Sequence, residues 1–284
     1  VGSANAADVT ASAATSITFN GADGGDTGNG WTMTDSVTFS ASGEMDNGFT
    51  ISTTLELDGN VMDTRKLSIG MGDMGTLTFG GDGTSGPIGS WDDITPSANE
   101  EAHGVTVNGT IAGAANAAAT NDIFVYDYTI MDGLALKASY TPSDGATAVD
   151  SSMDYGVLYT GVEGLSVYAA AGENNNAAAG IDNTMFGAKY AMGAFTIGYQ
   201  VNETDSSTAS ADEEFTALGV SYAVSDDLSV SLNSSTIDFE GGTNDQEATG
   251  ISFSYTSGGM TISGTHSTVD NVGGTATADN TGYE

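Results

Sequence analysis

Residues 218–233 read LGVSYAVSDDLSVSLN, two runs of alternating apolar and polar residues around an acidic break. Successive side chains of a β-strand point to opposite faces, so each run has one apolar and one polar face. The apolar face ends in an aromatic residue beside the break, and its members are Leu218, Val220, Tyr222, Leu228, Val230 and Leu232. Serine, glycine and asparagine occupy the other face. The stretch therefore predicts a β-hairpin with one face in an apolar environment.

A tyrosine returns at this place in successive hairpins. The spacings are 31, 31, 32 and 33 residues, and the tyrosines are Tyr128, Tyr159, Tyr190, Tyr222 and Tyr255. A repeat of this length holds two strands of about ten residues, the length that a tilted strand needs to cross a bilayer. Aromatic residues at one level are typical of the interfacial girdle of a membrane barrel. We therefore expect an all-β, transmembrane, antiparallel up-and-down barrel whose aromatic girdle lies near the short turns.

The tight turns set the expected size of the barrel. They fall near residues 46, 73, 132, 162, 193, 225 and 258, and alternating with longer loops they give sixteen strands in one domain, residues 1–284. The first strand is centred on residues 16–20, and residues 281–284 predict a last strand that is cut short. Ala4-Asn5-Ala6 has the small-x-small form of a cleavage site. Residues 1–6 are therefore either a signal-peptide remnant or an ordinary lead into the first strand.

Charge and composition exclude several classes of protein. The chain has 38 acidic against 4 basic residues and a net charge of −34, which excludes nucleic acid as a partner because phosphate binding needs Lys and Arg. The same imbalance favours cations. There is no cysteine, which excludes a disulfide scaffold. No run of about eighteen apolar residues predicts a spanning helix.

One long connection interrupts the alternation, over residues 81–120. Around it, three segments resemble the Gram-negative general porins, and the resemblance extends over essentially the whole chain. The segments are RKLSIGMGDMGTLTFGGDG (65–83), NDIFVYDYTIMDGLALKASY (121–140) and NTGYE (280–284). The resemblance implies a sixteen-stranded homotrimeric channel in the lipid of the bacterial outer membrane. It also implies that the third loop, residues 81–120, folds into the barrel and narrows it.

In that family, acids on the inward loop face bases on the wall across a water-filled constriction. The matching acids of this chain are Asp82, Asp92, Asp93, Glu100 and Glu101. Alternation points Lys66, Lys137 and Lys189 inward, whereas Arg65 falls on the other face but near a strand end. Bases are fewer than in a usual porin wall. We therefore expect a weakly cation-selective passive diffusion channel for small hydrophilic solutes and cations, although each acid alone could also be plain solvated loop surface.

Two other functions fit parts of the pattern. A soluble, secreted, acidic β-rich adhesin or surface-layer protein would share the acidity and the alternation. An outer-membrane barrel hydrolase would share the fold and could use His103 or His266, but no serine stands in a G-x-S-x-G context. We therefore expect no enzyme activity and no obligatory cofactor. Calcium is a possible ligand, because Asp92-Asp93 and Glu100-Glu101 offer carboxylate oxygens without EF-hand spacing.

Overall fold

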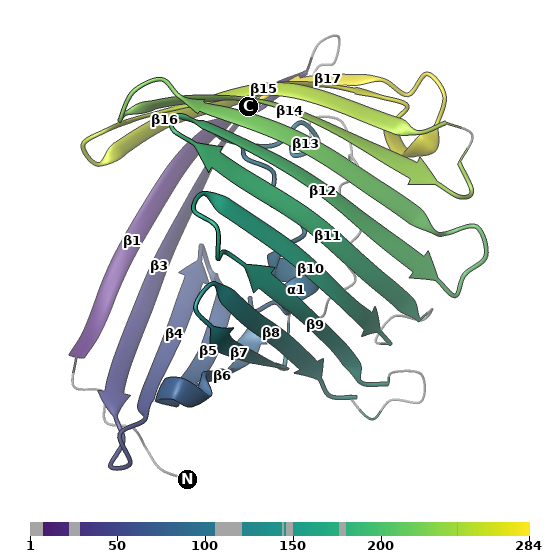
Figure 1. Ribbon diagram of the computed structural model, residues 1–284. Helices are drawn as coiled ribbons and strands as arrows, with labels where there is room; N and C mark the ends of the chain where they lie inside the picture. The colour runs from purple at the N-terminus through teal and green to yellow at the C-terminus, as the bar shows by residue number, and fades with distance from the viewer. Residues whose placement is uncertain are drawn as a thin grey trace.

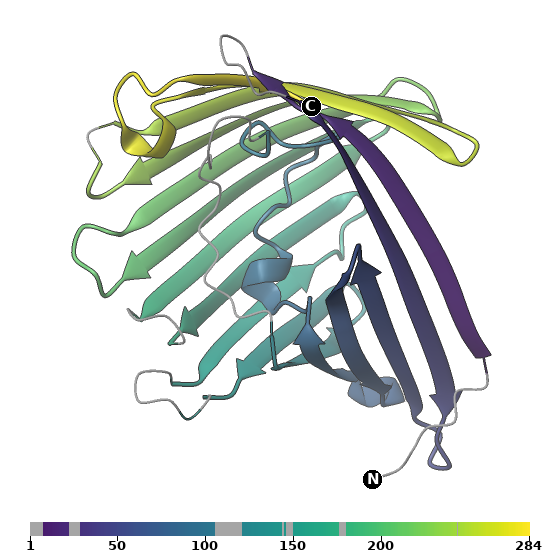
Figure 2. The same ribbon diagram turned by 180° about the vertical axis from the view of Figure 1, so that it is seen from behind.

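Antiparallel hairpins follow one another along the chain and form one sheet that curls into a barrel (Figures 1 and 2). The computed structural model describes residues 8–22, 29–105, 121–143, 145, 150–175, 180–242 and 244–284. The strands are β1 (Asp8–Phe19), β2 (Gly21–Ala22), β3 (Trp31–Glu44), β4 (Thr50–Asp58), β5 (Val61–Gly70), β6 (Thr76–Asp82), β7 (Ile123–Met131), β8 (Leu134–Thr141), β9 (Ser152–Tyr159), β10 (Leu165–Asn174), β11 (Ile181–Met192), β12 (Phe195–Ser206), β13 (Glu213–Ala223), β14 (Leu228–Phe239), β15 (Gln246–Ser257), β16 (Met260–Asp270) and β17 (Asn280–Tyr283). Short helical turns are η1 (Gly72–Met74), α1 (Pro87–Ser90) and η2 (Val272–Gly274). Among the described residues, no helix has the length and apolar character needed to cross a bilayer.

The sheet has apolar side chains on its exposed outer face and polar side chains on its inner face, the reverse of the arrangement in a soluble protein. On the outer face, Leu232 is 62% and Ile251 54% exposed. On the inner face, Gln200 is 0% and Ser252 2% exposed. Large exposed apolar residues in a continuous band, with polar residues inside, are typical of a barrel whose outer face meets lipid. The transmembrane barrel is therefore confirmed as the fold, in place of the soluble β-rich alternative.

All seven tight turns lie where the sequence predicts them. One example joins β3 to β4, where the Gly48 N–H donates to the Met45 carbonyl over 2.9 Å. Gly48 has a φ of +81°, a conformation that costs glycine little and other residues more. The preceding Asn47 side chain accepts a hydrogen bond from the Phe49 N–H. The Asn-Gly pair thus fixes the hairpin register, as hairpin turn chemistry requires.

Within the described residues the strand count differs slightly from the prediction, with seventeen segments instead of sixteen. The predicted first strand is divided at Asn20 into β1 and β2, because the two parts have different partners. All of β1 pairs with β3, whereas β2 pairs with β17 through Ala22–Gly282 and Gly21–Tyr283. The barrel is therefore nearly closed, by a short contact between β2 and β17.

The apolar band has a boundary at each end. The girdle tyrosines lie at the short-turn end, and a row of carboxylates lies on the same outer face near the long-loop end. By alternation from the tyrosines, this row comprises Glu173, Asp182, Glu203, Glu214, Asp238, Glu247 and Asp270. Several are direct cross-strand neighbours, such as Glu214 and Asp238. Charged residues are costly in hydrocarbon, so the two rows limit the part of the wall that faces acyl chains.

Candidate functional site

The connection after β6 turns into the barrel, where α1 and the residues after it are seen inside the ring of strands (Figure 2). Ile88 of α1 and Ile94 pack in a buried cluster with Ala170 and Met185 of the wall. Trp91 covers this cluster together with Tyr168 of β10, and their ring centroids are 5.6 Å apart. Apolar packing therefore fixes the first part of the connection on the inner wall.

Hydrogen bonds fix the middle of the connection. The Ile94 N–H donates to Gln200 Oε1 on β12 over 2.8 Å, and Gln200 Nε2 donates to the Asp92 carbonyl. Farther along, Asn233 Nδ2 on β14 donates to the Pro96 carbonyl over 3.0 Å. The wall shields these backbone N–H and C=O groups of the segment from water, and the two amide side chains supply the hydrogen bonds that they would otherwise lack.

The last part of the segment crosses β14, β15 and β16 in the same way. The Ala98 N–H donates to Ser231 Oγ over 3.0 Å. Asn99 Nδ2 and the Glu100 N–H donate to Thr265 Oγ1 on β16 over 3.0 and 3.1 Å. Residues 83–105 therefore follow the inner wall from β8 to β16.

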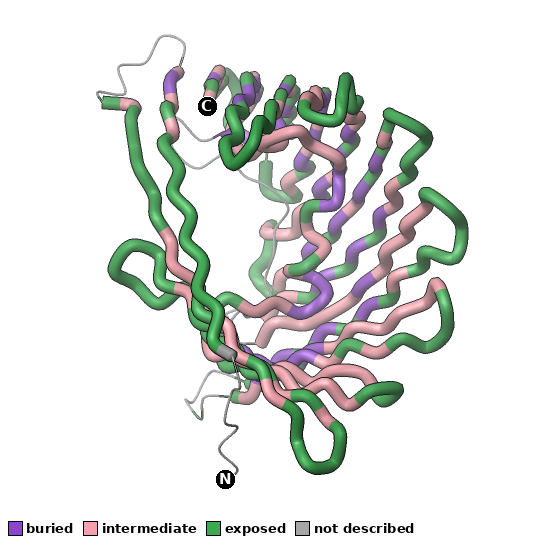
Figure 3. Tube along the Cα trace, turned by 90° about the vertical axis from the view of Figure 1, so that its left-hand side faces the viewer, coloured by how far each residue is buried: buried purple, intermediate pink, exposed green. Residues whose placement is uncertain are grey.

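Glycines on the inner face make room for this segment. At each, an added Cβ would meet the segment's atoms, and the positions are Gly156, Gly187, Gly198, Gly219 and Gly250. For example, a Cβ at Gly250 would lie 3.0 Å from Ala102 Cα. Figure 3 shows buried positions alternating with more exposed ones along the strands of the barrel. The close contact between segment and wall thus depends on residues with no side chain.

Two of the predicted acids meet on the segment. The Asp93 and Glu101 side chains are joined by a hydrogen bond. Burial, followed by this hydrogen bond, raises the pKa of Glu101 to about 8. Burial also raises the pKa of Glu100, and the charges of Glu284 and Asp93 add to the effect. Glu101 is therefore largely protonated at neutral pH, next to the Asp93 side chain.

His103 follows these acids and packs on the wall. Its ring lies edge-on to Phe215 of β13, with centroids 5.1 Å apart. Burial lowers the pKa of His103, while the charge of Asp93 opposes the shift. Its Nδ1 atom is buried and has no hydrogen-bond partner among the described residues. A neutral imidazole packed on Phe215 fits a structural role of His103 in the loop better than the role of a general base.

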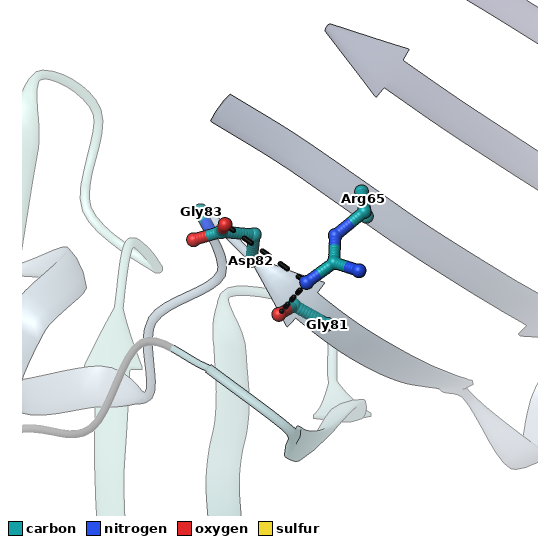
Figure 4. Close-up of polar contacts among 4 residues, drawn as sticks. All are labelled: Arg65, Gly81, Asp82 and Gly83. Carbon is teal, nitrogen blue, oxygen red and sulfur yellow. Dashed lines mark hydrogen bonds and ion pairs between the residues drawn. The ribbon is translucent and has the colours of Figure 1, made fainter. Parts of the chain in front are cut away.

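Asp82, the last residue of β6, lies beside Arg65, which is in the middle of β5 and not near a strand end as predicted (Figure 4). Arg65 Nη2 is 4.0 Å from Asp82 Oδ2 and donates to the Gly81 carbonyl over 2.9 Å. Cross-strand register sets Arg65 opposite Leu55 of β4, an exposed apolar residue of the outer face. This pair is therefore separate from Asp93 and Glu101. The fifth predicted acid, Asp92, follows α1, and its carbonyl is held by Gln200.

The three lysines lie on the inner face in different surroundings. Lys137 is the register partner of Asp127, and its Nζ is 3.7 Å from Asp127 Oδ1. Lys189 lies opposite Ser166, and Lys66 lies opposite Thr54. Asp127 was not among the predicted site residues, although alternation from the neighbouring girdle tyrosine places it on the inner face. The ion pair partly cancels the positive charge of Lys137.

The girdle tyrosines lie one in each of β7, β9, β11, β13 and β15, next to the short turns. Tyr159, Tyr190, Tyr222 and Tyr255 are between 37% and 42% exposed, so their rings are half out of the wall. Tyr128 is half-buried and stacks on Tyr126 with centroids 6.1 Å apart. Partly exposed aromatic rings with a polar tip suit a membrane–water interface.

Parts of the prediction lie outside the described residues. These are residues 1–6, the possible signal-peptide remnant, and residues 106–120, the second part of the predicted constriction loop. Within the described ranges, no group of three or more histidine, aspartate or glutamate side chains is placed to hold a metal ion. The calcium prediction therefore has no assigned position.

Comparison with known proteins gives the chain its family. A family model described as Gram-negative porin matches residues 2–283. A search of curated proteins finds no match. The fold is similar to that of an anion-selective porin from Comamonas acidovorans, at 13% identity and a TM-score of 0.71, over 97% of this chain and 98% of the other.

Two further solved structures are similar. OmpT, an outer membrane protein of Vibrio cholerae, is 16% identical with a TM-score of 0.73, over 99% of this chain and 98% of the other, and it is also known in a trimer form. Salmonella typhi OmpF, in complex with daunomycin, is 12% identical with a TM-score of 0.72, over 97% of this chain and 95% of the other. At these identities the likeness shows the fold. The family match and the barrel geometry agree, and the chain belongs to the Gram-negative porins of the bacterial outer membrane.

Proposed function

We propose that this porin is a weakly cation-selective channel through which small hydrophilic solutes and ions diffuse passively. The observation that carries the proposal is the acidic segment held along the inner wall by residues of β12, β14 and β16. A polar lumen with an inward segment leaves a water-filled path whose charges bias the passage of ions.

Charge favours cations along this path. Asp93, Glu100 and Glu101 lie on the segment, whereas the charge of Lys137 is partly cancelled by Asp127. Carboxylates in a pore raise the local concentration of cations and lower that of anions. The Comamonas acidovorans porin is anion-selective, but at 13% identity its wall charges do not transfer to this chain.

Three further properties belong to the same proposal. A homotrimer in outer-membrane lipid is proposed from the family and from the trimer form of OmpT. The absence of catalysis stays a prediction, which a lipid-hydrolysis assay of the protein and its His266→Ala variant tests. Calcium binding by the acidic segment also stays a prediction, tested by adding a chelator during channel recording.

The test of selectivity is the zero-current potential of the purified protein in a planar bilayer under a KCl gradient. We expect the sign that marks preference for K⁺ over Cl⁻, and a smaller value in the variant D93N/E100Q/E101Q. A matched control, D226N/D227N/E163Q, removes three carboxylates from exposed turns at the short-turn rim and should leave the potential near that of the parent. Preference for Cl⁻, or an equal effect of both triple variants, would contradict the proposal.

A further inference from the structure

A hollow of about 780 Å³ lies in the lumen between residues 90–101 and the wall of β9 to β13. Its lining combines three kinds of group that differ from the serine and threonine of most of the inner face. They are two aromatic rings, one lysine and a pair of carboxyl groups, namely Trp91, Tyr168, Lys189, Asp93 and Glu101. A concave site with an apolar surface and a few convergent polar groups is the usual form of a small-molecule site.

The wall side of the hollow has a fixed geometry. Ser166 of β10 is the register partner of Lys189 on β11, and Tyr168 follows Ser166 on the same face. Tyr168 and Lys189 are therefore diagonal neighbours, at a usual Cα separation of about 7–8 Å. Leu158 of β9 lies directly opposite Tyr168, and Trp91 contacts the Tyr168 ring from the segment. An apolar surface with an ammonium group at its edge results.

The segment side of the hollow carries the opposite charge. Asp93 and Glu101 line it, and their side chains are joined by a hydrogen bond. Among the described residues, Lys189 makes no ion pair, whereas Lys137 pairs with Asp127 at 3.7 Å. One cationic and one anionic group thus face the same water-filled hollow.

We propose that this hollow is a solute subsite for zwitterionic amino acids with an aromatic or large apolar side chain. The carboxylate of the solute meets Lys189, its ammonium group meets the Asp93–Glu101 pair, and its side chain lies on Trp91, Tyr168 and Leu158. The subsite rests on the proposed function, because a solute reaches it only through an open channel. A neutral sugar could use the rings but neither charge.

The experiment records single channels in a planar bilayer while L-phenylalanine is added. We expect concentration-dependent, transient blocks of the current, with glycine and maltose blocking at least about fivefold more weakly. Glycine keeps both charges without the ring, and maltose keeps a stacking surface without the charges. The variants Trp91→Leu and Lys189→Met should each raise the half-blocking concentration of phenylalanine about fivefold or more.

Lys66→Met is the matched control, because Lys66 is also an inner-face lysine but does not line the hollow. Phenylalanine should block the Lys66→Met channel at the same concentration as the parent channel. Equal effects of Lys66→Met and Lys189→Met, or maltose blocking as strongly as phenylalanine, overturn the subsite. If the channel conducts ions but phenylalanine does not block it, the subsite proposal is overturned and the proposed function is not. A protein that inserts without conductance overturns the proposed function, and the subsite with it.

Discussion

The charge of Glu101 should make the selectivity of the pore depend on pH. Its pKa is raised to about 8 by burial and by the hydrogen bond with Asp93, so the side chain is neutral below that value and ionised above it. From about pH 7 to about pH 9, its ionised fraction should rise from roughly a tenth to roughly nine-tenths. His103 stays neutral over this range because burial lowers its pKa. The segment therefore gains about one negative charge.

The size of the effect follows from electrostatics. A unit charge about 6 Å from a passing ion changes its energy by about 0.7 kcal/mol in water, and by about 0.4 kcal/mol after screening in 0.1 M salt. This energy corresponds to about a twofold gain for K⁺ and about a twofold loss for Cl⁻. We therefore expect the permeability ratio of K⁺ to Cl⁻ to rise about fourfold between these pH values.

The assay is the zero-current potential of the same bilayer, measured while the pH of both chambers is raised together. The variant Glu101→Gln removes the titrating group and should show almost none of the rise. Glu163→Gln removes a carboxylate from an exposed turn and should keep the full rise. A rise that persists in Glu101→Gln, or a parent protein whose ratio falls with pH, would refute the reasoning.

Other predictions concern the attachment of the segment and the wall charges. Gly187→Val places methyl groups where Ile94 lies, so it should destabilise the fold by about 1–3 kcal/mol and increase the conductance, measured by thermal unfolding in detergent and by single-channel recording. Unchanged values would contradict the packing. Gln200→Ala leaves buried backbone groups without partners and should cost about 1–3 kcal/mol, with noisier open-channel current; a quiet, equally stable channel would argue against this anchor. Lys137→Gln leaves Asp127 without its cation and should increase K⁺ preference, whereas Asp127→Asn should decrease it. If the two variants shifted the zero-current potential in the same direction, the ion pair would lie outside the path of the ions.

The barrel and its faces could be predicted because they depend on local alternation. Tyr222 and its apolar neighbours share a face in any extended strand, and turns such as Asn47-Gly48 are recognisable from their residue types. The division of the first strand could not be predicted. Nothing in the residues around Asn20 shows that β1 and β2 pair with partners so far apart in the sequence.

The site was predicted only in outline. Its acids were recognisable from their position in the long connection, but Gln200 and Asn233 resemble any polar residue of a wet lumen. Their role depends on backbone groups that lie 106 and 137 residues earlier in the chain and reach them only in the folded barrel. The pairing of Asp82 with Arg65 likewise depends on a bulge between β5 and β6, which alternation alone does not reveal.

The central claim is that the acidic segment lies in the path of the ions, and one introduced cysteine tests it directly. The chain has no cysteine, so Asp93→Cys carries a unique thiol. During bilayer recording, an ammonium-bearing thiol reagent should reduce K⁺ preference and a sulfonate-bearing reagent should increase it, each with a stepwise drop in current. Gly259→Cys, at an open turn, should show neither change. If mass spectrometry shows the Asp93→Cys protein to be labelled while its current and zero-current potential stay constant, the segment does not line the conducting path.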